Sequence, residues 1–256
     1  MRELAIQHIS VAVDGKEVVH DVSFTLASGE VAVLMGPNGS GKSTLVNALM
    51  GHPDYEVREG ALLLDGEDIT ALPVHEKAQK GLFLSLQHTP RVGGINLATF
   101  LHKVHIARTG ECVDVLEYYL YLREIAQRLS INEDLLDRPI TAGLSGGEKK
   151  LSEVLQLAAL KPRFAILDEI DAGVDVDAMK KVFKAVSVLA GEGTGFLVIS
   201  HQPALLTHVY PVHVFLMADG RLVRSAGREL AEEIHRDGFC KAIKCPKMLH
   251  CGTECG

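Results

Sequence analysis

Residues 36–44 form a glycine-rich loop, GPNGSGKST, that matches the pattern G-x-x-x-x-G-K-[ST]. Glycines allow consecutive backbone N–H groups to turn toward one anion, because a Cβ atom would obstruct the approach. Lys42 can reach the β- and γ-phosphates of a nucleotide, and the hydroxyl of Ser43 can bind Mg²⁺. The loop therefore predicts a site for a nucleoside triphosphate and its magnesium ion. The predicted phosphate-binding residues are Gly36, Pro37, Asn38, Gly39, Ser40, Gly41, Lys42, Ser43 and Thr44.

Two adjacent acids, Asp168 and Glu169, follow the apolar run 164–167. Asp168 is suited to hold Mg²⁺, and Glu169 is suited to polarise an attacking water as the general base. Paired acids can also simply end a strand. The glycine-rich loop upstream favours the chemical interpretation, because nucleotides bind at the carboxyl ends of parallel strands.

Gln87 and His201 each come at the end of another strand-like run. Gln87 can contact Mg²⁺ or the attacking water, and His201 can donate a hydrogen bond to the γ-phosphate. Either residue alone carries little signal. Their positions at strand ends predict that both belong to the same site.

The string Ser145-Gly146-Gly147 opens a second helical run, 149–160. A serine and two glycines at a helix N-terminus make a second anion site. A single chain has no obvious need for two such sites. In a head-to-tail pair of chains, the second site of each subunit can bind the γ-phosphate of the nucleotide held by the other subunit.

The elements that must position these residues are strands followed by helices. Strand-like runs lie at residues 4–13, 17–26, 31–35, 60–64, 81–86, 164–167, 196–200, 212–217 and 221–224. Residues 97–160 instead show mainly helical spacing, and residues 178–189 form a further helical run. This alternation predicts an α/β fold with a largely parallel sheet and a helical insertion.

Composition narrows the possible partners and compartment. The 256 residues carry a net charge of −7, which argues against a broad nucleic-acid footprint. No apolar run approaches the ~20 residues that span a bilayer. The N-terminus has no basic-then-apolar signal pattern. We therefore expect a soluble cytoplasmic protein that neither inserts into a membrane nor binds nucleic acid.

Together these motifs resemble the ABC ATPases over about residues 3–237. The resemblance implies a P-loop core with a mixed sheet, an antiparallel β subdomain and a helical signature subdomain at about 97–160. It also implies an ATP-dependent homodimer that sandwiches ATP between the P-loop and Ser145–Gly147 of the two subunits. Asp171 would lie in the loop that communicates across that dimer. The expected ATPase domain spans 1–237, followed by a cysteine-rich tail at 238–256.

Among these ATPases, the amino-acid sequence is most similar to the SufC-type ATPases of SUF iron–sulfur cluster assembly. The similar segments are SGGEKK (145–150), ILDEIDAGVDVDAMK (166–180), DGRLVRSAG (219–227) and the partner-docking stretch QHTPRVGGINLATFL (87–101). This resemblance implies a soluble SufB/SufD-like scaffold as partner. Two alternatives stay open: the ATP-binding subunit of an ABC membrane transporter, and a regulatory module that holds ATP but scarcely hydrolyses it.

The C-terminal tail is rich in cysteine. Cys240, Cys245, Cys251 and Cys255 fall within the last 17 residues. Cytosolic thiols stay reduced, so four thiolates together predict a site for Zn²⁺ or an iron–sulfur cluster. The spacing is not that of a typical zinc ribbon, and free thiols on a flexible tail are the alternative. The resemblance does not extend to this tail.

Overall fold

The computed structural model describes residues 2–85, 94–140, 143–168, 175–200 and 210–243. Its strands are β1 Glu3–Val13, β2 Lys16–Ala27, β3 Val31–Met35, β4 Tyr55–Leu64, β5 Glu67–Asp68, β6 Leu82–Ser85, β7 Phe164–Asp168, β8 Gly195–Ser200, β9 His213–Ala218 and β10 Arg221–Ala226. Its helices are α1 Lys42–Met50, α2 Val74–Gln79, α3 Leu97–Thr109, α4 Val115–Arg128, the 3-10 turn η1 Glu133–Leu136, α5 Gly146–Leu160, α6 Val176–Gly191 and α7 Arg228–Ala242.

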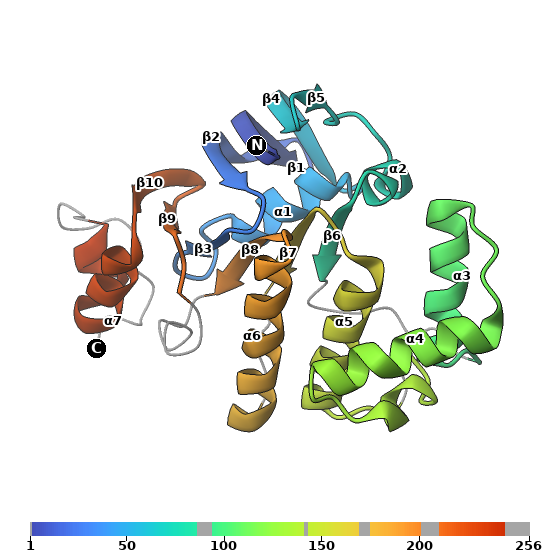
Figure 1. Cartoon of the computed structure of the whole chain (residues 1–256). Helices are drawn as coiled ribbons and strands as arrows, with labels where there is room; N and C mark the ends of the chain where they lie inside the picture. The colour runs from blue at the N-terminus through green and yellow to red at the C-terminus, as the bar shows by residue number, and fades with distance from the viewer. Residues whose placement is uncertain (1, 86–93, 141–142, 169–174, 201–209, 244–256) are drawn as a thin grey trace.

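A six-stranded sheet, in the order β10-β9-β3-β8-β7-β6, forms the centre of the molecule (Figure 1). The pairs β9–β3, β3–β8, β8–β7 and β7–β6 are parallel, and β10 is antiparallel to β9. Non-consecutive neighbours such as β3 and β8 require crossovers, which the helices supply. This arrangement confirms the predicted α/β core.

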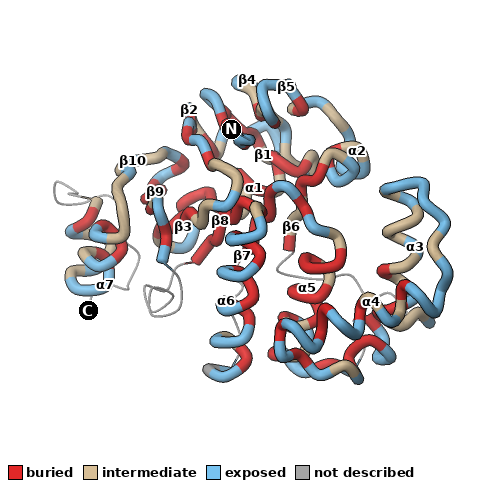
Figure 2. The backbone as a smooth tube through the Cα atoms, viewed as in Figure 1, coloured by how far each residue is buried: buried red, intermediate tan, exposed pale blue. Residues whose placement is uncertain are grey.

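Other elements of the fold cover both faces of this sheet, and the side chains of successive residues in one strand point to opposite faces. Val33 and Met35 pack with the cluster formed by α3 to α7, whereas Ala32 and Leu34 pack with α1 and the antiparallel strands. Every residue of β7 and β8 is accordingly buried, as are Ala32 to Met35 of β3; buried residues are red in Figure 2. A strand buried on both faces has no polar side, so its sequence reads as a continuous apolar run.

A second sheet, in the order β2-β1-β4-β5, is antiparallel. Its first hairpin turns at Asp14-Gly15, where φ is 50° and 77°. Both residues thus adopt the left-handed conformation that a two-residue hairpin turn requires, as expected for an Asp-Gly pair. The predicted hairpin is confirmed, but β4 begins five residues earlier than the predicted strand at 60–64.

The predicted helical insertion is confirmed as α3, α4, η1 and α5, which pack beside β6 (Figure 1). Each of α3 and α4 begins at a side-chain cap: Asn96 accepts from the N–H of Thr99, and Asp114 accepts from the N–H of Leu116. Caps of this kind satisfy N–H groups that have no partner within the helix.

The helix α7 lies at the opposite side of the molecule from α3 (Figure 1). It crosses the expected domain boundary after residue 237 with a kink at Gly238, where φ is 78°. Ala242 beyond the kink is fully buried. The boundary itself stays a prediction. Across the ranges described, no helix combines the length and apolar character needed to cross a membrane.

Candidate active site

Four neighbouring strands of the central sheet end level with one another. Met35 of β3 pairs with Ser200 of β8, and Ile199 of β8 pairs with Asp168 of β7. Ser85 of β6 pairs with Leu167 of β7. These pairs bring the glycine-rich loop, Asp168 and the carboxyl ends of β6 and β8 to one edge of the sheet, where nucleotides bind in α/β folds.

Four residues of the predicted nucleotide site lie outside the described residues: Gln87, Glu169, Asp171 and His201. Three of them follow β6, β7 and β8 closely in sequence, and these three strands share the edge just described. Their assigned roles stay predictions.

The glycine-rich loop is held against the end of β9. A Cβ atom built on Gly36 would lie 2.2 Å from the carbonyl oxygen of Met217 and 2.7 Å from Oγ of Ser40. The loop is also tied to the β9–β10 turn, because the N–H of Gly220 donates to the carbonyl of Ser40 at 3.1 Å. The first glycine of the motif is therefore needed for packing as well as for phosphate access.

Lys42 lies inside this loop and is 6 % exposed. Its Nζ donates to the carbonyls of Gly36 at 2.8 Å and Pro37 at 2.9 Å, and to Oγ of Ser40 at 3.3 Å. These three neutral acceptors fix the position of the ammonium group within the loop. An ammonium, hydroxyl groups and backbone N–H donors are the groups that bind polyphosphate, so the loop fits a nucleotide.

The helix α1 presents its N-terminus to the loop. Its N-cap is Gly41, with φ 96° and no side-chain cap, and its first turn holds no acid. The N–H groups of that turn and the positive end of the helix dipole thus suit an anion. Ser43 and Thr44 are half-buried in the same turn.

The C-terminus of α1 is held by Lys77, a residue of α2 that is 1 % exposed. Its Nζ donates to the carbonyl of Leu49 at 2.9 Å and to that of Thr70 at 3.0 Å. Burial lowers the pKa of Lys77 to about 8, and the charge of Asp68 opposes this shift only in part. Sequence reasoning missed this residue, because a lone lysine in a short helix matches no motif.

We expect Lys77→Met to destabilise the fold increasingly as the pH rises from 8 to 10. The unfolded chain keeps the ordinary lysine pKa of 10.5, so in this range it binds more protons than the folded chain. Rising pH therefore favours the folded wild type, by at most about 1.4 kcal/mol per pH unit, and this gain is absent from the variant. Urea unfolding of both chains at pH 8 and pH 9.5 measures the difference; an unchanged gap would contradict the prediction.

Asp168 is the last residue of β7 and is 4 % exposed. Burial of a carboxylate is costly unless a cation or hydrogen-bond donors compensate its charge. A buried carboxylate at the same sheet edge as the P-loop fits the predicted role of Mg²⁺ ligand, together with the hydroxyl of Ser43. Within the described part of the chain, no group of three or more His, Cys, Asp or Glu side chains could hold a metal ion.

The signature string caps α5. The N–H of Glu148 donates to Oγ of Ser145 at 3.2 Å, and the N–H of Ser145 donates to Oε2 of Glu148 at 2.8 Å. This capping box lowers the pKa of Glu148, chiefly through the backbone N–H of Ser145. Ser145 and Gly146 are exposed, and Gly147 is buried against Ala178.

A family model described as "ABC transporter" matches residues 19–172. The chain belongs to this family. Proteins with this P-loop fold hydrolyse ATP, so the chain is an ABC ATPase. It is 42 % identical to a probable ABC transporter ATP-binding protein of Streptococcus pyogenes serotype M3, over 93 % of this chain and 94 % of that protein.

Solved structures show the same fold for this ABC ATPase. One is a nucleotide-free ATP-binding cassette from an ABC transporter, with a TM-score of 0.78, 25 % identity, and coverage of 96 % of this chain and 100 % of that one. A dimeric cassette with bound ADP and Pi has a TM-score of 0.76 and covers 88 % of this chain and 98 % of that one. At 18 % identity the second likeness shows the fold alone.

The structure also describes one of the four tail cysteines. Cys240 lies on α7 and is half-buried. Cys245, Cys251 and Cys255 lie outside the described residues. The predicted Zn²⁺ or iron–sulfur site of the tail therefore stays a prediction.

Proposed function

We propose that this ABC ATPase hydrolyses Mg-ATP as a homodimer and changes the shape of a soluble SufB/SufD-like iron–sulfur scaffold. The observation that carries the ATPase chemistry is the common edge reached by β3, β6, β7 and β8. The SUF role is supported by the sequence at the start of α5, SGGEKK (145–150), and by that of residues 166–180. The cytoplasmic location and the tail metal site belong to the same proposal.

The chain's own groups divide the work as follows. Lys42 and the amides of residues 38–43 bind the phosphates, and Ser43, Asp168 and Gln87 bind Mg²⁺ or sense it. Bound Mg²⁺ would neutralise charge that develops on the transferred phosphoryl group. Glu169 takes the proton of the attacking water.

Two further groups act around the γ-phosphate. His201 donates a hydrogen bond to it. The exposed cap of α5 points to action in trans, because Ser145 and Gly146 face outward rather than into the core. Their hydroxyl and N–H groups would bind the γ-phosphate of the second subunit, and Asp171 would couple the two sites across the dimer.

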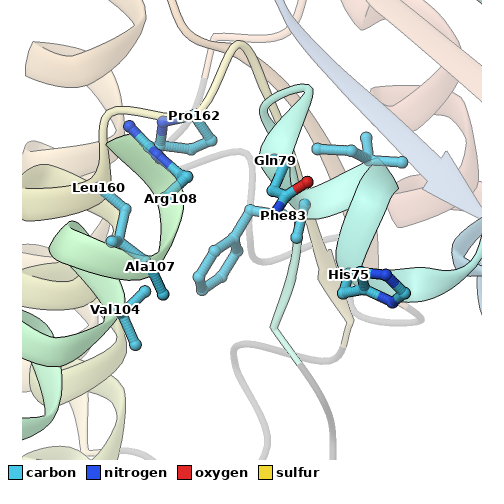
Figure 3. Close-up of a pocket in the computed structure, with 10 residues that line it drawn as sticks. His75, Gln79, Phe83, Val104, Ala107, Arg108, Leu160 and Pro162 are labelled. Atoms are coloured by element: carbon cyan, nitrogen blue, oxygen red, sulfur yellow. The ribbon is translucent and has the colours of Figure 1, made fainter. Parts of the chain in front are cut away.

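A cavity of about 230 Å³ supports a docked partner. It opens between α2 and β6 on one side and α3 and the end of α5 on the other (Figure 3). Its lining is mainly apolar and includes Leu82, Phe83 and Val104, with Arg108 at the side of α3. β6 ends just before residues 87–101, the segment that resembles a partner-docking stretch. α3 begins inside this segment at Leu97 and continues past it to the lining residues Val104 and Arg108. The cavity suits an apolar side chain with a neighbouring acid.

We expect tagged Glu169→Gln chain, with ATP and Mg²⁺ under anaerobic conditions, to capture a soluble protein that carries iron and sulfide from its native lysate. Adding Val104→Glu should abolish capture, because a charge would enter the apolar cavity. Val188→Glu, on the exposed face of α6, is the matched control and should leave capture intact. Mass spectrometry identifies the bound protein. Capture of a polytopic membrane protein instead would establish the transporter alternative.

A further inference from the structure

A buried polar cluster joins helix α5 to the central sheet. It comprises Ser85, the last residue of β6, with Lys150 and Glu153 of α5, and we refer to it as the Ser85 triad. These residues are 2 %, 8 % and 8 % exposed. The hydroxyl of Ser85 donates to Oε2 of Glu153, and Nζ of Lys150 donates to Oε2 at 3.0 Å and Oε1 at 3.3 Å.

Stability alone does not explain such a cluster. Desolvation of a buried ion pair offsets most of its electrostatic attraction, and well-packed apolar replacements are often neutral or stabilising. What a buried polar cluster adds is a single permitted arrangement, because any shift of one member leaves another without its partner. The Ser85 triad therefore fixes how α5 sits on β6.

The two elements it joins carry different parts of the active site. Ser85 pairs with Leu167, the residue before Asp168. Glu153 lies about two helical turns from Ser145, the cap of the same helix. A fixed contact between Ser85 and Glu153 thus sets the position of the signature cap relative to the sheet edge that holds Asp168.

We propose that Ser85 and Glu153 are positioning residues for ATP hydrolysis. Through their hydrogen bond, the N-terminus of α5 keeps the orientation in which Ser145 can reach the second subunit's nucleotide. The inference rests on the proposed roles of Ser145 and Asp168. It makes no use of the partner protein, so the test needs only this chain and ATP.

Ser85→Ala should lower kcat roughly tenfold while the KM for ATP stays within about twofold, because small misplacements of a catalytic group cost rate rather than binding to the P-loop. In the Glu169→Gln background, Ser85→Ala should raise by roughly tenfold the ATP concentration that half-saturates dimer formation, measured by light scattering. Ser85→Thr keeps the hydroxyl and should restore both values.

Thr194→Val is the matched control. The hydroxyl of Thr194 is also buried, and it donates to the carbonyl of Pro162 at 2.9 Å. Thr194 directly precedes β8, so this bond lies at the amino-terminal end of the parallel strands, away from the nucleotide site. A wild-type kcat for Ser85→Ala, or an equal loss in Thr194→Val, would overturn the inference. So would full additivity of Ser85→Ala and Glu153→Gln, since two halves of one contact do not add. Absence of any dimer in Glu169→Gln itself would instead refute the proposed role of Ser145.

Discussion

Glu169→Gln is expected to reduce ATP hydrolysis by a factor of about 10²–10⁴, the usual contribution of a general base. Glutamine keeps the size and hydrogen-bonding ability of the side chain but cannot accept the proton of the attacking water. ATP would then stay bound between two subunits, so the variant should elute as a dimer with ATP and Mg²⁺ and as a monomer after chelation of the metal. Phosphate release and light scattering measure the two effects.

Glu192→Gln provides the control for this experiment. Glu192 follows α6, where its carboxylate pairs with Arg128 at the surface, and neither residue belongs to the proposed site. We expect wild-type turnover from this variant, because exposed ion pairs contribute little. If Glu169→Gln hydrolysed ATP at the wild-type rate, the assignment of Glu169 as the general base would be wrong.

The sequence predicts the parts of this fold that local patterns determine. The continuous apolar run 31–35 predicts a strand buried on both faces, and the structure confirms this for β3. The runs 164–167 and 196–200 predict strands, which the structure confirms as β7 and β8. The glycine-rich loop and the cap at Ser145 are equally local, since each depends on residues adjacent in sequence. Their chemistry follows from residue type and spacing, and so the P-loop and the start of α5 were both predictable.

Contacts between distant segments leave little trace in the sequence. Ser85 and Glu153 are 68 residues apart, and a serine at the end of an apolar strand matches no motif. The partial signal was Lys150 and Glu153, two opposite charges at i, i+3 on the face of α5 that also carries Val154 and Leu157. The packing of Gly36 against Met217 is still less visible, because the motif explains the glycine through phosphate binding alone.

Gly36→Ala is expected to lower the affinity for ATP about 100-fold, which corresponds to about 2.7 kcal/mol. The new Cβ would lie 2.2 Å from the carbonyl oxygen of Met217, whereas real contacts of this kind are longer than 3 Å. Met217 belongs to β9 and pairs with Leu222 of β10, so its carbonyl is held by the sheet. The loop must give way instead, and this displaces the amides and Lys42 from their positions around the phosphates.

Gly191→Ala separates this local effect from a general loss of stability. Gly191 is the last residue of α6, its added Cβ would meet no atom within 4 Å, and its φ is not positive. Alanine there should preserve ATP binding and leave the melting temperature unchanged or slightly higher. Titration with a fluorescent ATP analogue and thermal unfolding compare the two variants. Wild-type ATP affinity in Gly36→Ala would mean that the loop can move away from β9 and still bind phosphate. The close approach of Gly36 to Met217 would then be unimportant for nucleotide binding.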